Sequence, residues 1–67
     1  MEQHDNEPML QFFVFSHLNE KLQAVSKPFA ELALKLVQEV PRNPERTVAL
    51  RKLLESKDAA VRAAFYR

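Results

Sequence analysis

The residues best suited to chemistry are basic side chains in the last third of the chain. On a helical wheel Arg46 and Lys57 both fall within about 40° of Leu50, so their charges share the apolar stripe of one helix. Either their stems pack on that stripe while the charges reach solvent at its edge, or the charges line an interface pocket for an anion. Arg46 also lies in the first helical turn, where free backbone N–H groups favour phosphate.

The spacing of these two residues predicts that such a pocket depends on oligomerisation. Arg46 and Lys57 lie about 16 Å apart along a helix axis. One small ligand cannot comfortably contact both side chains of a single helix. Two antiparallel copies of the helix would bring Arg46 of one subunit near Lys57 of another.

The other charged residues of this helix follow a four-residue spacing. Arg51 precedes Glu55 by four positions, and Asp58 precedes Arg62 by four. This spacing predicts two ion pairs on a solvated face, each worth tenths of a kcal/mol. Net charge over residues 44–67 is +3, from six basic and three acidic residues. That charge is modest beside the phosphate contacts of DNA-binding proteins, so nucleic acid is not the expected partner.

An aromatic cluster near the N-terminus offers a second kind of contact. Phe12, Phe13 and Phe15 are followed by His17. These rings are either core or interface residues, or one of them stacks on a nucleobase. His17 either makes a structural hydrogen bond or contacts a base or phosphate beside Phe13 or Phe15.

Composition excludes most catalytic and cofactor sites. The 67 residues include no glycine and no cysteine, so glycine-rich phosphate loops, nucleophile elbows, disulfides and thiolate metal sites are absent. His4 and His17 alone are too few for a zinc site. We therefore expect no enzyme, no cofactor and no metal. The acidic N-terminus resembles neither a secretory signal nor a transit peptide, which favours the cytoplasm.

Two helices must position the basic residues. Residues 1–9 are expected to form a flexible tail, and residues 10–67 a single domain that opens with an extended arm over 10–15. A helix is predicted over residues 18–40, with a seam of Leu18, Leu22, Val25, Phe29, Leu32, Leu36 and Val40. Pro28 either kinks this helix or divides it, with Ser26 capping the second part.

A turn and a second helix complete the predicted domain. Asn43 is placed as an N-cap with Pro44 at the first helical position, which predicts a helix over 44–66. A connection of about four residues makes the two helices antiparallel. The expected fold is therefore all-α, an antiparallel helical hairpin with a short extended N-terminal arm. Extra apolar residues on the first helix, and the small size of the chain, predict a homo-oligomer; they are Ala30, Ala33, Leu34 and Val37.

The second helix also carries a resemblance to a known family. The segment from Pro44 to Ser56 resembles the closing helix of the phage cyclic-nucleotide sponges, the small anti-CBASS and anti-Thoeris proteins. The matching residues are Glu45-Arg46-Thr47, Ala49-Leu50 and Lys52-Leu53-Leu54-Glu55-Ser56. Upstream, Phe13-Val14-Phe15-Ser16-His17 is similar to the aromatic-x-Tyr-His entry of the anti-Thoeris members, with Phe15 in place of Tyr.

This resemblance implies a function. The family sequesters cyclic nucleotide or cyclic ADP-ribose immune signals without cleaving them, as dimers or trimers of dimers with pockets between subunits. It implies that Arg46, Arg51 and Lys52 contact phosphates, with Lys57 a weaker candidate. Thr47 would donate a hydrogen bond, and Phe13, Phe15 or His17 would stack on or cap a base. The alternative is a small oligomeric protein-interaction module or inhibitor with no small-molecule ligand.

Overall fold

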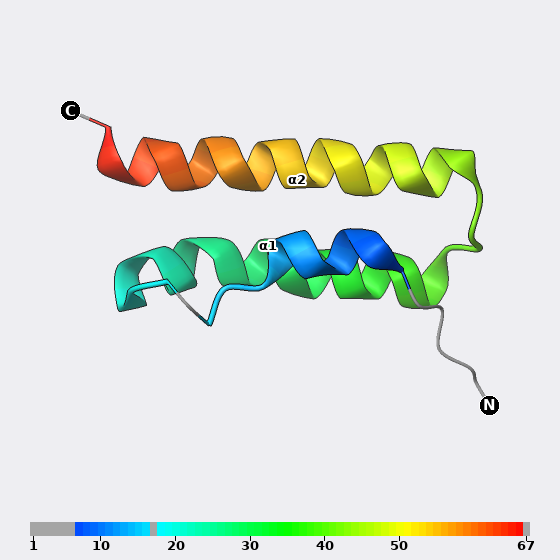
Figure 1. Cartoon of the computed structure of the whole chain (residues 1–67), viewed down its shortest axis with the longest axis horizontal. Coiled ribbons are helices and arrows are strands. Elements are labelled where there is room, and N and C mark those ends of the chain that lie inside the picture. Colours follow the sequence, from blue (N-terminus) through cyan, green and yellow to red (C-terminus); the bar gives the residue numbers. More distant parts are fainter. Residues whose placement is uncertain (1–6, 17, 67) are drawn as a thin grey trace.

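The computed structural model describes residues 7–16 and 18–66, and in that part of the chain it is all-helical. A 3₁₀ helix, η1, covers Pro8–Phe13. Two α-helices follow, α1 over Glu20–Glu39 and α2 over Pro44–Phe65 (Figure 1). The predicted all-α class is confirmed.

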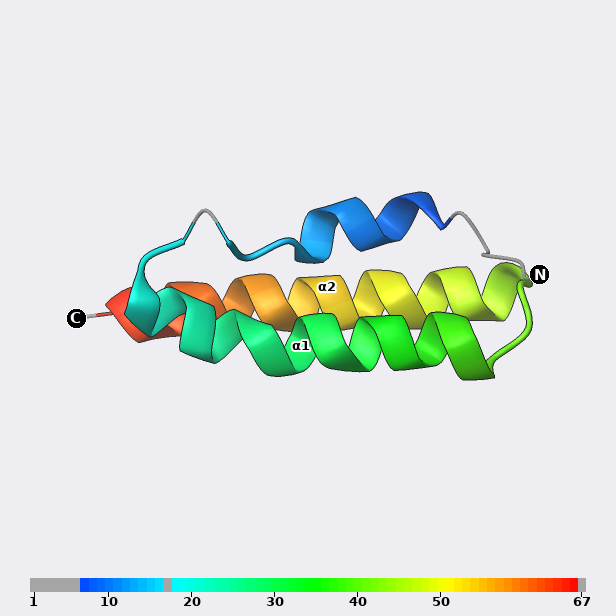
Figure 2. The ribbon, with the colours of Figure 1, turned by 90° about the horizontal axis from the view of Figure 1, so that it is seen from below.

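The two long helices lie side by side and run in opposite directions (Figures 1 and 2). At one end of the pair, the Lys21 ammonium donates a hydrogen bond of 3.3 Å to the carbonyl of Ala64. At the other end a short connection joins Glu39 to Pro44. Figure 2 shows η1 lying along one side of this pair.

Helix α1 is a single helix with Pro28 inside it. The side chain of Asn19 caps it by accepting a 2.9 Å hydrogen bond from the backbone N–H of Leu22. Ser26 is therefore not a cap but a buried residue in the helix interior. Pro28 removes the hydrogen bond to the Ala24 carbonyl, and packing against α2 and η1 keeps the helix continuous.

Helix α2 begins as the sequence predicts. The Asn43 side chain accepts a 2.8 Å hydrogen bond from the Arg46 backbone N–H. Pro44 follows in the first turn, where a backbone N–H would have no intrahelical acceptor, so its absence costs no hydrogen bond. Glu45 places a negative charge near the helix N-terminus, which interacts favourably with the helix dipole. The helix ends at Phe65, one residue before the predicted end.

The predicted extended arm over residues 10–15 is wrong for residues 10–13. Pro8–Phe13 form η1, and Val14, which follows it, has an extended backbone. Glu7 caps this helix, because its Oε2 accepts a 3.2 Å hydrogen bond from the Met9 backbone N–H. Residues 7–9 of the predicted tail therefore belong to the cap and first turn of η1, and residues 1–6 of that tail lie outside the described residues. The Glu7 cap and Pro8 favour a helix at this position. The described residues contain no strand with which the β-prone residues could pair.

Helix η1 also changes which face of α1 is buried. Phe13, Ala33 and Leu50 are buried together at the centre of the core. Leu32, predicted on the seam, is 46% exposed, whereas Ala33 is fully buried. The wide apolar face of α1 is therefore covered in part by its own chain. Partly buried residues complete the core: Met9, Leu10, Phe29, Ala30, Leu36, Val37, Leu53 and Leu54.

None of the helices in the described part of the chain is long and apolar enough to cross a membrane.

Candidate functional site

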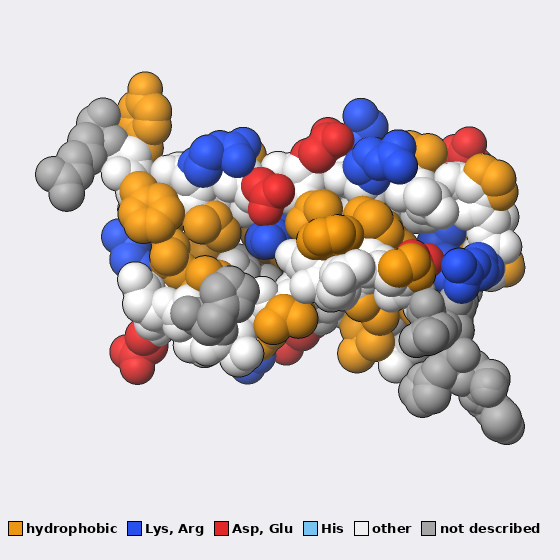
Figure 3. Space-filling model, in the orientation of Figure 1, with side chains coloured by type: hydrophobic (Ala, Val, Ile, Leu, Met, Phe, Trp, Pro, Cys, Tyr) orange, Lys and Arg blue, Asp and Glu red, His pale blue; other side chains and the backbone are white. Residues whose placement is uncertain are grey.

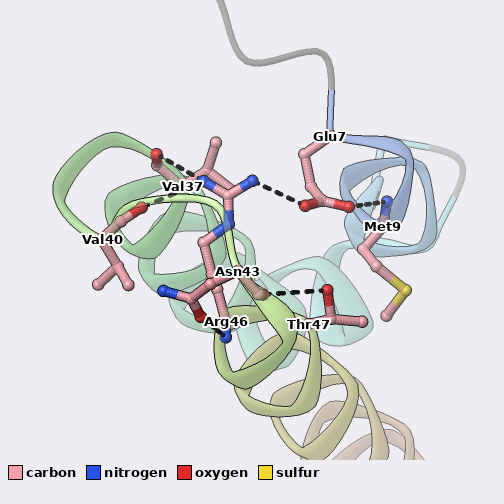
Figure 4. Close-up of polar contacts among 7 residues, drawn as sticks. All are labelled: Glu7, Met9, Val37, Val40, Asn43, Arg46 and Thr47. Atoms are coloured by element: carbon pink, nitrogen blue, oxygen red, sulfur yellow. Dashed lines mark hydrogen bonds and ion pairs between the residues drawn. The ribbon is translucent and has the colours of Figure 1, made fainter.

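The guanidinium of Arg46 is at the centre of a buried polar cluster (Figure 4). Its Nη2 donates to Oε1 of Glu7 at 2.9 Å, and the two side chains are only 1% and 5% exposed. Its Nη1 donates to the carbonyls of Val37 at 3.3 Å and Val40 at 3.1 Å. Arg46 therefore joins three elements: the cap of η1, the C-terminal end of α1 and the first turn of α2.

This arrangement corrects both interpretations of Arg46. Its charge neither reaches solvent at the edge of the stripe nor faces an external anion. The last carbonyls of α1 have no intrahelical donors, and a cation at a helix C-terminus satisfies them and interacts favourably with the dipole. The Glu7 carboxylate accepts one charge-assisted hydrogen bond from Nη2 of Arg46 through Oε1, and its other oxygen accepts from the Met9 backbone N–H. In this arrangement the Arg46 guanidinium is buried and bonded within the chain.

An open groove lies elsewhere, between η1 with the segment that follows it and the C-terminal half of α2. Its volume is about 400 Å³. Figure 3 shows the face seen in Figure 1, where apolar and charged side chains of both signs lie side by side. The groove is lined by Gln11, Phe12, Val14, Leu18, Lys57, Asp58, Val61 and Arg62.

Lys57 connects the two walls of this groove. Its Nζ donates to the Phe12 carbonyl at 3.0 Å and lies 3.0 Å from Oδ1 of Asp58. The Lys57 side chain is 14% exposed, so its stem is packed while its ammonium reaches the groove. Lys57 was the weaker candidate from the sequence, and the structure places it at the groove.

The groove combines an aromatic surface with a small excess of positive charge. Phe12 is 52% exposed, and Arg62 is exposed on the α2 wall. With Lys57 and Arg62 positive and Asp58 negative, the lining carries a net charge of +1. An aromatic ring can stack on a planar base, and a guanidinium can bind a phosphate with two hydrogen bonds.

The remaining polar candidates of the sequence do not line this groove. The Thr47 hydroxyl lies 3.5 Å from the carbonyl of Asn43. Arg51 and Lys52 are exposed on α2. Lys52 lies 3.7 Å from Glu55, and Asp58 pairs with Lys57. The predicted pairs Arg51–Glu55 and Asp58–Arg62 are therefore wrong within the described residues, where side chains one and three positions apart pair instead.

The aromatic candidates also differ in whether they reach the groove. Phe13 is in the core and 3% exposed, so it cannot stack on a ligand at the surface. Phe15 is half-buried, and His17 lies outside the described residues. Phe12 is the aromatic residue of η1 that reaches the groove. A short helix turns successive residues to different sides, which distinguishes Phe12 from Phe13.

Among the polar and aromatic groove residues, the sequence does not single out Gln11 and Arg62 as ligand contacts, and it does not distinguish Phe12 from the other two aromatic candidates. The Glu7-Pro8 start of a helix contains the signal for Phe12, since a helix over Pro8–Phe13 separates an exposed from a buried aromatic residue. Arg62 was assigned to an ion pair on a solvated face. Only the packing of η1 against α2 shows that this face borders a groove.

In comparisons with family models, with curated proteins and with solved structures, nothing matches this chain. The geometry of the groove and the residues that line it are therefore the basis for a proposed function.

Proposed function

We propose that this chain is a non-enzymatic binding module that sequesters a phosphate-bearing cyclic nucleotide or cyclic ADP-ribose, as a phage anti-defence sponge in the host cytoplasm. The groove carries the proposal, because it gathers an ammonium, a guanidinium and an exposed aromatic ring around one volume of about 400 Å³. Arg62 and Lys57 would bind the phosphates. Phe12 would stack on the base.

The proposal includes self-association into dimers or trimers of dimers. A groove of about 400 Å³ lies at the low end of the range for small-molecule sites, roughly 300–1,000 Å³, and it is open to solvent. A second copy would enclose a ligand that one copy only partly covers. Leu32, Leu34 and Val48 are exposed apolar residues outside the groove, and they support a contact between copies.

The test is a thermal-shift panel of cyclic dinucleotides, cyclic trinucleotides and cyclic ADP-ribose isomers. A ligand at 100 times its Kd stabilises the folded protein by about 2.7 kcal/mol. Arg62→Ala should abolish most of the shift. Lys35→Ala removes one exposed positive charge from α1, outside the groove, and should preserve the shift. Recovery of the intact ligand after heat denaturation would separate sequestration from cleavage.

A second candidate function is a protein-interaction module with no small-molecule ligand. The observation in its favour is the exposed aromatic pair at the end of α2, where Phe65 and Tyr66 are both accessible. Aromatic residues of this kind are enriched at the centres of protein interfaces. A flat response to the whole panel would refute the sponge proposal and favour this alternative.

A further inference from the structure

Asp58 is the groove residue that phosphate binding does not explain. Its carboxylate lines a groove in which the proposed ligand is an anion, and its side chain is 47% exposed. A negative charge there repels phosphate. The exposed part of the carboxylate is available to a ligand group that donates hydrogen bonds.

Lys57 holds this carboxylate close to η1. The Lys57 Nζ is 3.0 Å from Oδ1 of Asp58 and 3.0 Å from the Phe12 carbonyl oxygen, so these two acceptors are at most about 6 Å apart. Within the described residues, Oδ2 of Asp58 makes no hydrogen bond. A half-exposed carboxylate with an available oxygen thus lies in the same groove as Phe12.

An ionised carboxylate only accepts hydrogen bonds. The Watson–Crick edge of guanine presents two neighbouring donors, the N1–H and the N2 amino group, whereas that edge of adenine presents one donor and one acceptor. A carboxylate therefore matches guanine and opposes adenine. Because Phe12, Asp58 and Arg62 line the same groove, a nucleotide whose base stacks on Phe12 would share that groove with the carboxylate and the guanidinium.

We propose that Asp58 reads the base of the ligand and makes the groove selective for guanine-bearing cyclic nucleotides. The proposal rests on the function proposed for the same groove, since it names the base of the nucleotide whose phosphates Lys57 and Arg62 would bind. The +1 net charge of the lining retains attraction for the phosphates after the Asp58 charge is counted.

The experiment is isothermal titration calorimetry of the full chain with cyclic di-GMP and cyclic di-AMP. The wild-type protein should bind cyclic di-GMP about tenfold or more tightly, which is the lower range for a bidentate contact to a base. Asp58→Asn should lose this preference, because an amide pairs well with the donor and acceptor of adenine. Glu55→Gln is the matched control: it makes the same chemical change on α2 outside the groove and should retain the wild-type ratio.

The outcomes separate the two proposals. Equal affinity of the wild-type protein for both nucleotides, or an equal loss for both in Asp58→Asn, would overturn base reading and leave sequestration intact. Binding of neither nucleotide by the wild-type protein would also overturn base reading, and a flat response to the whole thermal-shift panel as well would overturn sequestration. Circular dichroism of each variant distinguishes a lost contact from a lost fold.

Discussion

Arg46 and Lys57 lie on the same face of α2, yet their surroundings differ in almost every physical respect. The Arg46 guanidinium is buried and bonded to Glu7 and to two carbonyls of α1. The Lys57 ammonium lies at an open groove, and it pairs with a carboxylate that is about half exposed. Helix η1 causes the difference. Its cap residue, Glu7, pairs with Arg46, and its last turn forms one wall of the groove beside Lys57.

The comparison shows that a basic residue on an apolar stripe has two distinct uses. At the N-terminal end of α2 the charge stabilises the fold, since the guanidinium donates hydrogen bonds to Glu7 and to the carbonyls of Val37 and Val40. At the C-terminal half the charge remains close to solvent, beside an aromatic ring and a second cation. We expect substitutions at the first position to change the free energy of unfolding and substitutions at the second to change binding.

The largest expected effect is that of Arg46→Ala. The substitution leaves the Glu7 carboxylate and the last carbonyls of α1 without their donor in the interior. Loss of one partner of a buried ion pair costs about 3–5 kcal/mol. For a chain of this length, the whole free energy of unfolding is about 3–10 kcal/mol. Urea unfolding followed by circular dichroism should show a largely unfolded or strongly destabilised protein.

A double-mutant cycle with Glu7→Ala provides the control. In the Arg46→Ala background, Glu7→Ala should cost much less than in the wild-type protein, because its partner is already missing. Additive losses would contradict the buried pair. A loss below about 1 kcal/mol for Arg46→Ala would also contradict it.

Phe13→Ala and Phe12→Ala form the next pair, since the neighbouring rings have opposite environments. Phe13→Ala creates a cavity beside Ala33 and Leu50 and should cost about 3 kcal/mol or more. Phe12→Ala should cost less than about 1 kcal/mol, because its ring is half exposed. Thermal unfolding of both variants tests the difference, and equal losses would show that η1 does not separate the two rings.

Lys57→Met should have an intermediate effect on stability. The substitution keeps an unbranched stem of similar length and removes the hydrogen bond from Nζ to the Phe12 carbonyl. We expect a loss of about 1 kcal/mol, a typical value for one hydrogen bond. Amide hydrogen exchange should be faster at the last turn of η1. Unchanged exchange there would indicate that Lys57 does not hold η1 against α2.

Arg62→Ala should have the smallest effect on stability, within about 0.5 kcal/mol, because the side chain is exposed. The same variant should lose affinity for a cyclic dinucleotide. Urea unfolding and titration calorimetry measure the two quantities on one sample. A strong loss of stability without a change in affinity would reverse the roles assigned to the two halves of α2.

The sequence predicts the helices well and their packing less well. Asn43 and Pro44 determine the start of α2 through local hydrogen bonds and backbone geometry, so neighbouring residues suffice to predict it. Pro28 left two alternatives open, because packing with α2 and η1 decides whether a proline interrupts a helix. The aromatic segment was expected to be extended, although Glu7 and Pro8 contained the signal for η1.

The candidate site could be predicted only in part, since it depends on contacts between residues far apart in the chain. The position of Lys57 on the helical wheel predicts a site residue. Arg46 has an equivalent position, and a helical wheel does not show that Glu7, 39 positions earlier, pairs with its guanidinium. Only the packing of η1 against α2 distinguishes Phe12 from Phe13 and places Arg62 at the groove.

The most direct test of the groove is a two-dimensional ¹H–¹⁵N NMR titration of the 7.8 kDa chain with cyclic di-GMP. If the ligand binds in the groove, chemical shifts should change at the backbone amides of Gln11, Phe12, Lys57 and Arg62, and the Arg46 side-chain signal should be unchanged. Changes centred on Arg46 and Thr47, or no changes at saturating ligand, would contradict it.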